Sequence, residues 1–328
     1  ARCKAWPRKI ERIVLLAAVN RGWSPSVAMT PRMRVAFWLG EVVEAFKMMI
    51  GLPRFYIFDT RRGSAFVTTV RLQSLALTQS GRAQPLVVQI LGTIDDLVSP
   101  ADNVDLVTGS DFAYLEAPRT GHRNVLQAEG DEGRRQVLRL AMTGTRDQIA
   151  GHERGLSSQL VRDYFTDAFD DFDDEDEVER HFKKRAAKVK LVVFVLHGIR
   201  DYGYWTKKIA GKVKQQFAEA SLDRGSRPFK PGDTCRTVTS TYGFFPMGPF
   251  LLPSERRKRV EWLMDQYVQA RALYPNADFS FVGHSNGTYL LAGAMECCPA
   301  IRFKRAVLAG SVLPTRFDWS SRMLAGQI

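Results

Sequence analysis

Hydrophobic and polar positions divide the C-terminal part of the chain into alternating strands and helices. Residues 191–196 (LVVFVL) form a continuous apolar run, which is typical of a strand buried in a parallel sheet. The expected strands lie at 191–196, 236–241, 279–282 and 305–312, and the expected helices at 210–220, 254–274 and 287–295. Ser254 is suited to cap the second of these helices. This order predicts an α/β fold with a mostly parallel, doubly wound sheet and helices on both faces.

The N-terminal part shows the same two kinds of segment with a long interruption. Strands are expected at 13–19, 86–91 and 112–116, and helices are expected to start near Pro100 and Val125. Residues 35–52 are apolar on balance, but Glu41, Glu44 and Lys47 interrupt them. This pattern favours a cap helix over a membrane-spanning helix.

A charged segment separates the two parts. Residues 163–179 (DYFTDAFDDFDDEDEVE) are dominated by carboxylates, and the basic stretch 180–190 follows them. Such a density of like charge resists packing and usually marks a linker. We therefore expect a first region at 1–145, a linker at 146–188 and a second region at 189–328.

Length, charge and cysteine content narrow the choice of class. The chain has 328 residues, which is enough for two domains, and a formal net charge of +12. The basic residues are scattered and form no aromatic-basic motif, so we expect a solvated basic surface, which could approach an anionic membrane, rather than a nucleic-acid site. The four cysteines show no metal-ligand spacing. We expect reduced thiols, a cytoplasmic location, and neither a metal nor a cofactor.

The motif Gly283-His284-Ser285-Asn286-Gly287 fits the pattern G-x-S-x-G. An apolar strand leads into it and a helix of small and apolar residues leads out. A nucleophilic serine needs such a tight turn because its hydroxyl must stand clear of the backbone, while the helix N-terminus stabilises negative charge. We therefore expect Ser285 to be a catalytic nucleophile.

The turn after the strand at 191–196 is the expected source of an oxyanion hole. Here the backbone N–H of Ile199 is the first candidate donor and that of Arg200 the second, with the N–H of Asn286 as the other donor. His197 is expected to hydrogen-bond within the turn rather than act as a base. The nearby aromatic side chains either line an acyl pocket or simply pack; they are Tyr202, Tyr204 and Trp205.

No histidine follows Ser285, so an acid and a base must come from elsewhere. Asp95 lies just beyond the strand at 86–91, and we prefer it to Asp96 as the acid. His122 lies in the loop after the strand at 112–116. An acid at the carboxyl end of a strand can orient a histidine and stabilise its charged form. Asp95 and His122 are therefore the expected acid and general base.

Together these motifs resemble those of the α/β-hydrolase superfamily, in particular its lipase- and esterase-like members. Residues 283–287 look like the nucleophile elbow, 197–198 like the oxyanion loop, 92–98 like the acid turn and 121–122 like the histidine loop. The resemblance implies an α/β-hydrolase fold and a serine hydrolase that cleaves ester-type, including lipid, substrates through an acyl-enzyme. It also assigns residues 22–80 to the position of a cap. The cap residues Phe37, Trp38, Phe46, Met48 and Met49 either cover an acyl chain or pack as its core.

The order of the motifs departs from that family, where the serine comes before the acid and the histidine. Residues 11–19 (ERIVLLAAV) are similar to residues 304–312 (KRAVLAGSV), which indicates a repeat. We expect a fragment of a tandem protein, in which 1–145 is the later half of one hydrolase unit and 189–328 the earlier half of another. A permuted single domain, with Asp95, His122 and Ser285 in one site, is the alternative. A non-catalytic binding module on the same scaffold is the alternative function.

Overall fold

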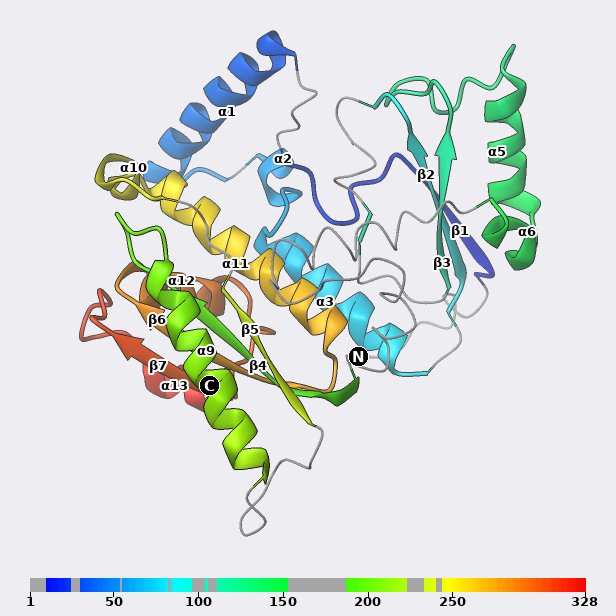
Figure 1. Cartoon of the computed structure of the whole chain (residues 1–328). Helices are drawn as coiled ribbons and strands as arrows, with labels where there is room; N and C mark the ends of the chain where they lie inside the picture. The colour runs from blue at the N-terminus through cyan, green and yellow to red at the C-terminus, as the bar shows by residue number, and fades with distance from the viewer. Residues whose placement is uncertain are drawn as a thin grey trace. The chain divides into compact units, whose positions relative to one another are not determined.

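The computed structural model describes residues 10–24, 30–53, 55–81, 84–95, 104–105, 111–152, 187–222, 233–239 and 244–328. The chain divides into two compact units, Ala1–Leu160 and Val161–Ile328 (Figure 1). The boundary falls within the linker expected from the charge pattern. Asp96 and Pro100 lie outside the described residues, so the helix expected near Pro100 is not described either.

Unit 1 is built on a parallel three-stranded sheet with the order β1-β2-β3. Its strands are β1 (Arg12–Leu16), β2 (Leu86–Gly92) and β3 (Phe112–Ala117). Its helices are α1 (Pro31–Met49), α2 (Tyr56–Asp59), α3 (Ala65–Gln79), α5 (Glu132–Thr143) and α6 (Arg146–Ala150). Each strand is parallel to its neighbour, so all three carboxyl ends lie on the same edge of the sheet.

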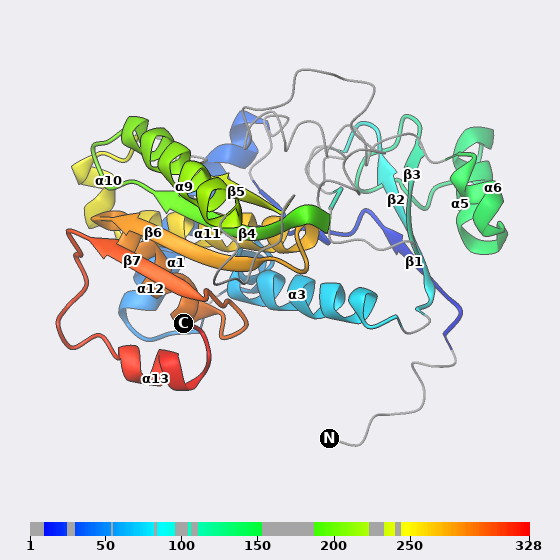
Figure 2. The same cartoon turned by 60° about the horizontal axis from the view of Figure 1, so that its bottom comes forward.

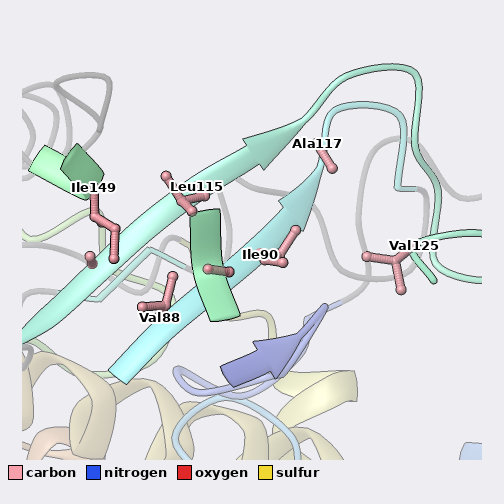
Figure 3. Close-up of a cluster of buried hydrophobic side chains, with 8 residues drawn as sticks. Val88, Ile90, Leu115, Ala117, Val125 and Ile149 are labelled. Atoms are coloured by element: carbon pink, nitrogen blue, oxygen red, sulfur yellow. The ribbon is translucent and has the colours of Figure 1, made fainter. Parts of the chain in front are cut away.

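The main core of unit 1 lies between this sheet and the two helices α5 and α6. Alternate residues of β2, Val88 and Ile90, point to this side because side chains along a strand alternate between faces. They pack with side chains of β3, α5 and α6 in one apolar cluster (Figure 3). Gln89, between them, faces the other side and is fully buried, where its amide donates to the Ala18 carbonyl oxygen.

Unit 2 contains a parallel four-stranded sheet with the order β5-β4-β6-β7. Its strands are β4 (Val189–Leu196), β5 (Thr234–Val238), β6 (Asp278–His284) and β7 (Arg305–Ala309). Its helices are α9 (Tyr204–Leu222), α10 (Met247–Leu251), α11 (Pro253–Leu273), α12 (Asn286–Cys297) and α13 (Trp319–Leu324). Figure 2 shows α9 on one face of the sheet and α12 on the other. The α/β class and the parallel sheets expected from the sequence are therefore confirmed.

Several element boundaries differ from the expected ones for identifiable reasons. No helix begins at Val125; α5 starts seven residues later, where the Asp131 side chain accepts a hydrogen bond from the Arg134 N–H as an N-cap. Ser254 does not cap α11, because Pro253 occupies the first helical position and fits there without an N–H to satisfy. The first residues of the expected linker form α6, which a capping box at Thr145 starts.

The residues expected to form a cap are helical, but the apolar side chains divide between two faces of α1. Phe37 packs edge-on against Trp23, with ring centroids 5.0 Å apart, and also contacts Phe58. Trp38, Phe46 and Met49 point to solvent and are 61%, 56% and 76% exposed. The side chain of Met48 lies outside the described residues. Among the helices that the structure describes, none is long and apolar enough to cross a membrane.

Candidate active site

Ser285 stands at the tight turn where β6 passes into α12. Its backbone angles are φ 52° and ψ −118°, a conformation that residues with a Cβ rarely adopt. The turn is held because the Ser285 N–H donates to the Ala309 carbonyl oxygen of β7 at 3.0 Å. The Ser285 carbonyl oxygen in turn accepts from the N–H and the hydroxyl of Thr288, at 2.9 and 2.7 Å. Backbone strain held in this way is a feature of functional sites.

The two glycines of the motif are required by close approaches of the backbone. A Cβ on Gly287 would lie 2.8 Å from the Leu196 carbonyl oxygen of the neighbouring strand β4. A Cβ on Gly283 would lie 3.1 Å from the backbone of Gly287 itself. The first distance is shorter than a carbon atom allows and the second is tighter than most such contacts, so the strand, the turn and α12 pack this closely because these side chains are absent.

The loop after β4 lies directly against the serine side chain. A Cβ on Gly198 would lie 2.8 Å from the Ser285 Cβ and 3.1 Å from its Oγ. The loop that carries Ile199, the first candidate oxyanion donor, therefore passes beside the serine side chain at Gly198. Arg200, the second candidate donor, was a wrong choice, because its N–H donates to the Phe245 carbonyl oxygen at 3.0 Å.

Asn286 is the first residue of α12 and is buried. The first N–H groups of a helix have no acceptor within the helix and point out of its N-terminus. Together with the partial positive charge of that terminus, they favour an anion beside Ser285. The loop at Gly198 and the first residue of α12 thus both adjoin Ser285.

His197 has the structural role that the sequence favours. Its side chain is 1% exposed, and Nδ1 lies 2.7 Å from the Gly198 carbonyl oxygen, to which it donates. Burial lowers the pKa of His197, although the Gly198 carbonyl and Asp201 oppose that effect. The imidazole is therefore neutral and fixes the shape of the loop.

Asp201, which was not among the residues expected from the sequence, organises the rest of this loop. One carboxylate oxygen accepts from the Gly203 N–H at 2.8 Å, and the other accepts from the indole N–H of Trp205 at 2.7 Å. Burial raises the pKa of Asp201, but these hydrogen bonds and the nearby His197 and His284 outweigh it and lower the pKa. The signal in the sequence was the Asp-x-Gly spacing, which is typical of a side-chain-closed turn.

An aromatic cluster extends from this loop. Trp205 meets His284 of the elbow edge-on, with ring centroids 5.8 Å apart. Tyr202 stacks on Phe244 at 5.0 Å and also contacts Tyr204. Tyr202 and Tyr204 are 60% and 79% exposed. They are therefore not packed in the core and present an apolar surface next to the elbow.

Within unit 1, the structure brings together the two residues expected to be the acid and the base. Nδ1 of His122 lies 3.3 Å from the Oδ2 of Asp95. The Asp95 side chain is fully buried, whereas 40% of the His122 side chain is exposed. A buried carboxylate that holds one ring nitrogen leaves the other nitrogen directed outwards as a proton acceptor.

The histidine loop is tied to the end of β2 and to α5. A Cβ on Gly92 would lie 2.2 Å from the Thr120 carbonyl oxygen, and this oxygen accepts from the Ile94 N–H at 3.1 Å. Arg134 of α5 is buried and donates to the Thr120 hydroxyl at 2.9 Å and to the Gln127 carbonyl oxygen. The sequence offered no signal for this role, because a basic residue in an amphipathic helix usually faces solvent.

Comparisons with protein-family models, curated proteins and solved structures find no match. Asp95 and His122 form one candidate half-site at the carboxyl edge of the unit 1 sheet. Ser285 and Asn286, with the loop at Gly198, form the other candidate half-site at the carboxyl edge of the unit 2 sheet. Among the described residues, no group of three or more His, Cys, Asp or Glu side chains could hold a metal ion.

Proposed function

We propose that this chain contributes to a serine hydrolase that cleaves ester-type substrates, including lipid and acyl esters, and that both units are parts of α/β-hydrolase folds. The observation that carries the proposal is the strained backbone of Ser285, which places its hydroxyl between Gly198 and the N-terminus of α12. The strain costs about 1–3 kcal/mol, and such a cost persists where an exposed nucleophile needs it. A structural strand-to-helix turn would not need that conformation.

The chemistry follows from the groups at the two half-sites. Oγ of Ser285 attacks the ester carbonyl carbon while an Asp–His pair like Asp95 and His122 takes its proton. The N–H groups of Ile199 and Asn286 stabilise the negative oxygen of the tetrahedral intermediate. The histidine then gives the proton to the departing alcohol, and an acyl-enzyme remains. Water, deprotonated by the same histidine, hydrolyses the acyl-enzyme and restores the serine.

The outward face of α1 supports contact with a lipid surface. A stripe of exposed apolar residues runs along the helix at helical spacing: Val35, Trp38, Leu39, Val42, Phe46 and Met49. Both acidic residues of α1 point the other way, since Glu41 pairs with Arg61 at 3.1 Å and Glu44 accepts from the Phe55 N–H at 3.0 Å. The face towards solvent is therefore apolar and carries no carboxylate, as in helices that lie in the interface of an anionic membrane.

Vesicle flotation tests this contact. We expect the chain to float with vesicles that contain phosphatidylserine. The double variant Trp38→Ser, Phe46→Ser should bind at least about 100-fold more weakly, because each side chain contributes about 1.5–3 kcal/mol when buried. Leu126→Ser with Met142→Ser, at two positions that are each 65% exposed, is the matched control and keeps binding. Equal binding by both double variants would rule out α1 as the contact.

Labelling with a fluorophosphonate probe tests the hydrolase proposal itself. We expect the probe to modify Ser285 in preference to Ser74, an exposed serine on α3 that serves as an internal reference. Ser285→Ala should remove this selectivity. If Ser285 reacts no faster than Ser74, both in this chain and in the extended chain described below, the hydrolase proposal is wrong. A non-catalytic binding module on the same scaffold then takes its place.

A further inference from the structure

β1 and β7 share more than a sequence resemblance. Arg12, Val14 and Leu15 align with Arg305, Val307 and Leu308 at one constant offset, and each strand starts at the aligned arginine and has five residues. Each strand also ends before a residue with positive φ, which is 45° in Ala17 and 52° in the aligned Gly310. Positive φ is uncommon for a residue other than glycine, so its presence at the aligned position is evidence independent of the sequence.

The two strands are paired on opposite edges. The Ala17 N–H donates to the Ile90 carbonyl oxygen of β2, so the groups of the preceding residue, Leu16, face away from β2. Ala309, which aligns with Leu16, accepts from the Ser285 N–H at the end of β6. The hydrogen-bonding groups of successive residues alternate between the two edges of a strand. When β1 is aligned with β7, β2 therefore pairs with one edge of the aligned strand and β6 pairs with the opposite edge.

The two strands also differ in whether their faces are covered. Val14 of β1 packs against the apolar cluster formed by the unit 1 sheet, α5 and α6. Val307, the aligned residue of β7, is 59% exposed. Within the part of the chain that the structure describes, no strand pairs with the second edge of β7. β7 therefore lacks, at both its edge and its face, the neighbours that β2 and α5 provide for β1.

We propose that the free edge of β7 binds, in parallel, a strand of the β2 type that ends in an acid and is followed by a β3-like strand with a histidine loop. This partner comes from a further acid–histidine segment similar to residues 84–152, not from the pair Asp95 and His122, whose own β1 occupies the equivalent edge. The inference rests on the proposed hydrolase function of Ser285. It names the partner that supplies the base to that serine.

The geometry of parallel sheets supports this arrangement. In the order β6–β7–partner strand, Ser285 and the partner's acid follow strands that are two spacings apart, which is about 10 Å at roughly 4.8 Å for each spacing. A histidine held by its acid, as His122 is held by Asp95 at 3.3 Å, can span the remaining gap to the serine hydroxyl. By the same reasoning, the edge of β1 opposite β2, with which no strand among the described residues pairs, accepts a β6-like strand that brings a serine to His122.

The test is an extended chain, in which a second copy of residues 84–152 follows Ile328 through a flexible linker of about 20 residues, with a root-mean-square span of roughly 25 Å. We expect the fluorophosphonate to label Ser285 about 100-fold faster or more than in the original chain, since a general base contributes about 10²–10⁴-fold. His122→Gln in the added copy should abolish the gain. The same substitution in the original copy is the matched control and should leave the gain intact.

Hydrogen exchange separates the failure of this inference from the failure of the proposed function. By the alternation of edges, the amides of Ala306 and Leu308 point to the free edge of β7, and the added copy should slow their exchange. If the exchange of these two amides slows but Ser285 is not labelled, the strand pairing is supported and the hydrolase function is rejected. Unchanged exchange would overturn the pairing. Fast labelling of the original chain that depends on its own His122 would also overturn it, because Ser285 then uses a single composite site.

Discussion

Replacing Ser285 by glycine should stabilise unit 2 relative to replacing it by alanine. Both substitutions remove the hydroxyl, but alanine keeps a Cβ at φ 52° and ψ −118° and glycine does not. Relief of the strain is worth about 1–3 kcal/mol. Glycine offsets about 0.4–1 kcal/mol of this through the greater entropy of the unfolded chain. We therefore expect Ser285→Gly to exceed Ser285→Ala by about 1 kcal/mol in the free energy of unfolding.

Hydrogen exchange of the β4 and β6 amides in increasing urea is the suitable assay, because a chain with two units need not unfold in a single transition. Ala220→Gly, at an exposed position of α9, is the control for glycine in ordinary helical backbone and should lose about 1 kcal/mol. If Ser285→Gly falls below Ser285→Ala by the same amount as this control, the backbone at Ser285 is not strained. The main support for a nucleophile would then be lost.

Three further predictions concern the loops around the half-sites. Gly198→Ala should slow the labelling of Ser285 at least about tenfold by placing a methyl group 2.8 Å from the Ser285 Cβ, whereas Gly211→Ala, with open space around it, should leave labelling unchanged. Gly92→Ala should destabilise unit 1 by about 1–3 kcal/mol, seen as faster exchange of the β2 amides, because the methyl would lie 2.2 Å from the Thr120 carbonyl oxygen. Burial lowers the pKa of His197 below its ordinary value of 6.5. The contribution of His197 to the stability of unit 2 should therefore be complete above pH 6.5 and decline as the pH falls from there towards the folded-state pKa. His197→Gln should flatten that part of a curve of unfolding free energy against pH.

Sequence patterns predicted the strands well, because buried parallel strands are continuous apolar runs and residues that favour turns follow their ends. The run at 191–196 became β4, and the acid and histidine expected after two successive strands do meet, with Asp95 and His122 3.3 Å apart. Parallel strands place all their carboxyl ends on one edge, so residues that are 27 positions apart in the chain can be expected to lie close together.

Two features of the structure could not be predicted from the sequence pattern. The composition of residues 35–52 indicated an apolar helix but not which of its side chains face solvent, and the structure turns Glu41 and Glu44 to partners inside the unit and apolar side chains such as Trp38 to solvent. Likewise, no local signal marks Arg134 as the residue that fixes the histidine loop, since its acceptors lie 7 to 15 positions away and are brought to it by the fold. Hydrogen-bond partners that only the tertiary fold brings together cannot be predicted from the local sequence.

The strained positions identify the edge on which function is to be sought. Among the described residues, four other than glycine have positive φ: Ala17, Arg119, Arg200 and Ser285. Each of them follows a strand, namely β1, β3, β4 and β6, so all four lie at the carboxyl edge of a parallel sheet. In open α/β sheets this is the edge where ligands bind. Conformations that cost free energy lie at one edge of both sheets and not at the other, and packing alone does not require this asymmetry. It agrees with the two proposed half-sites.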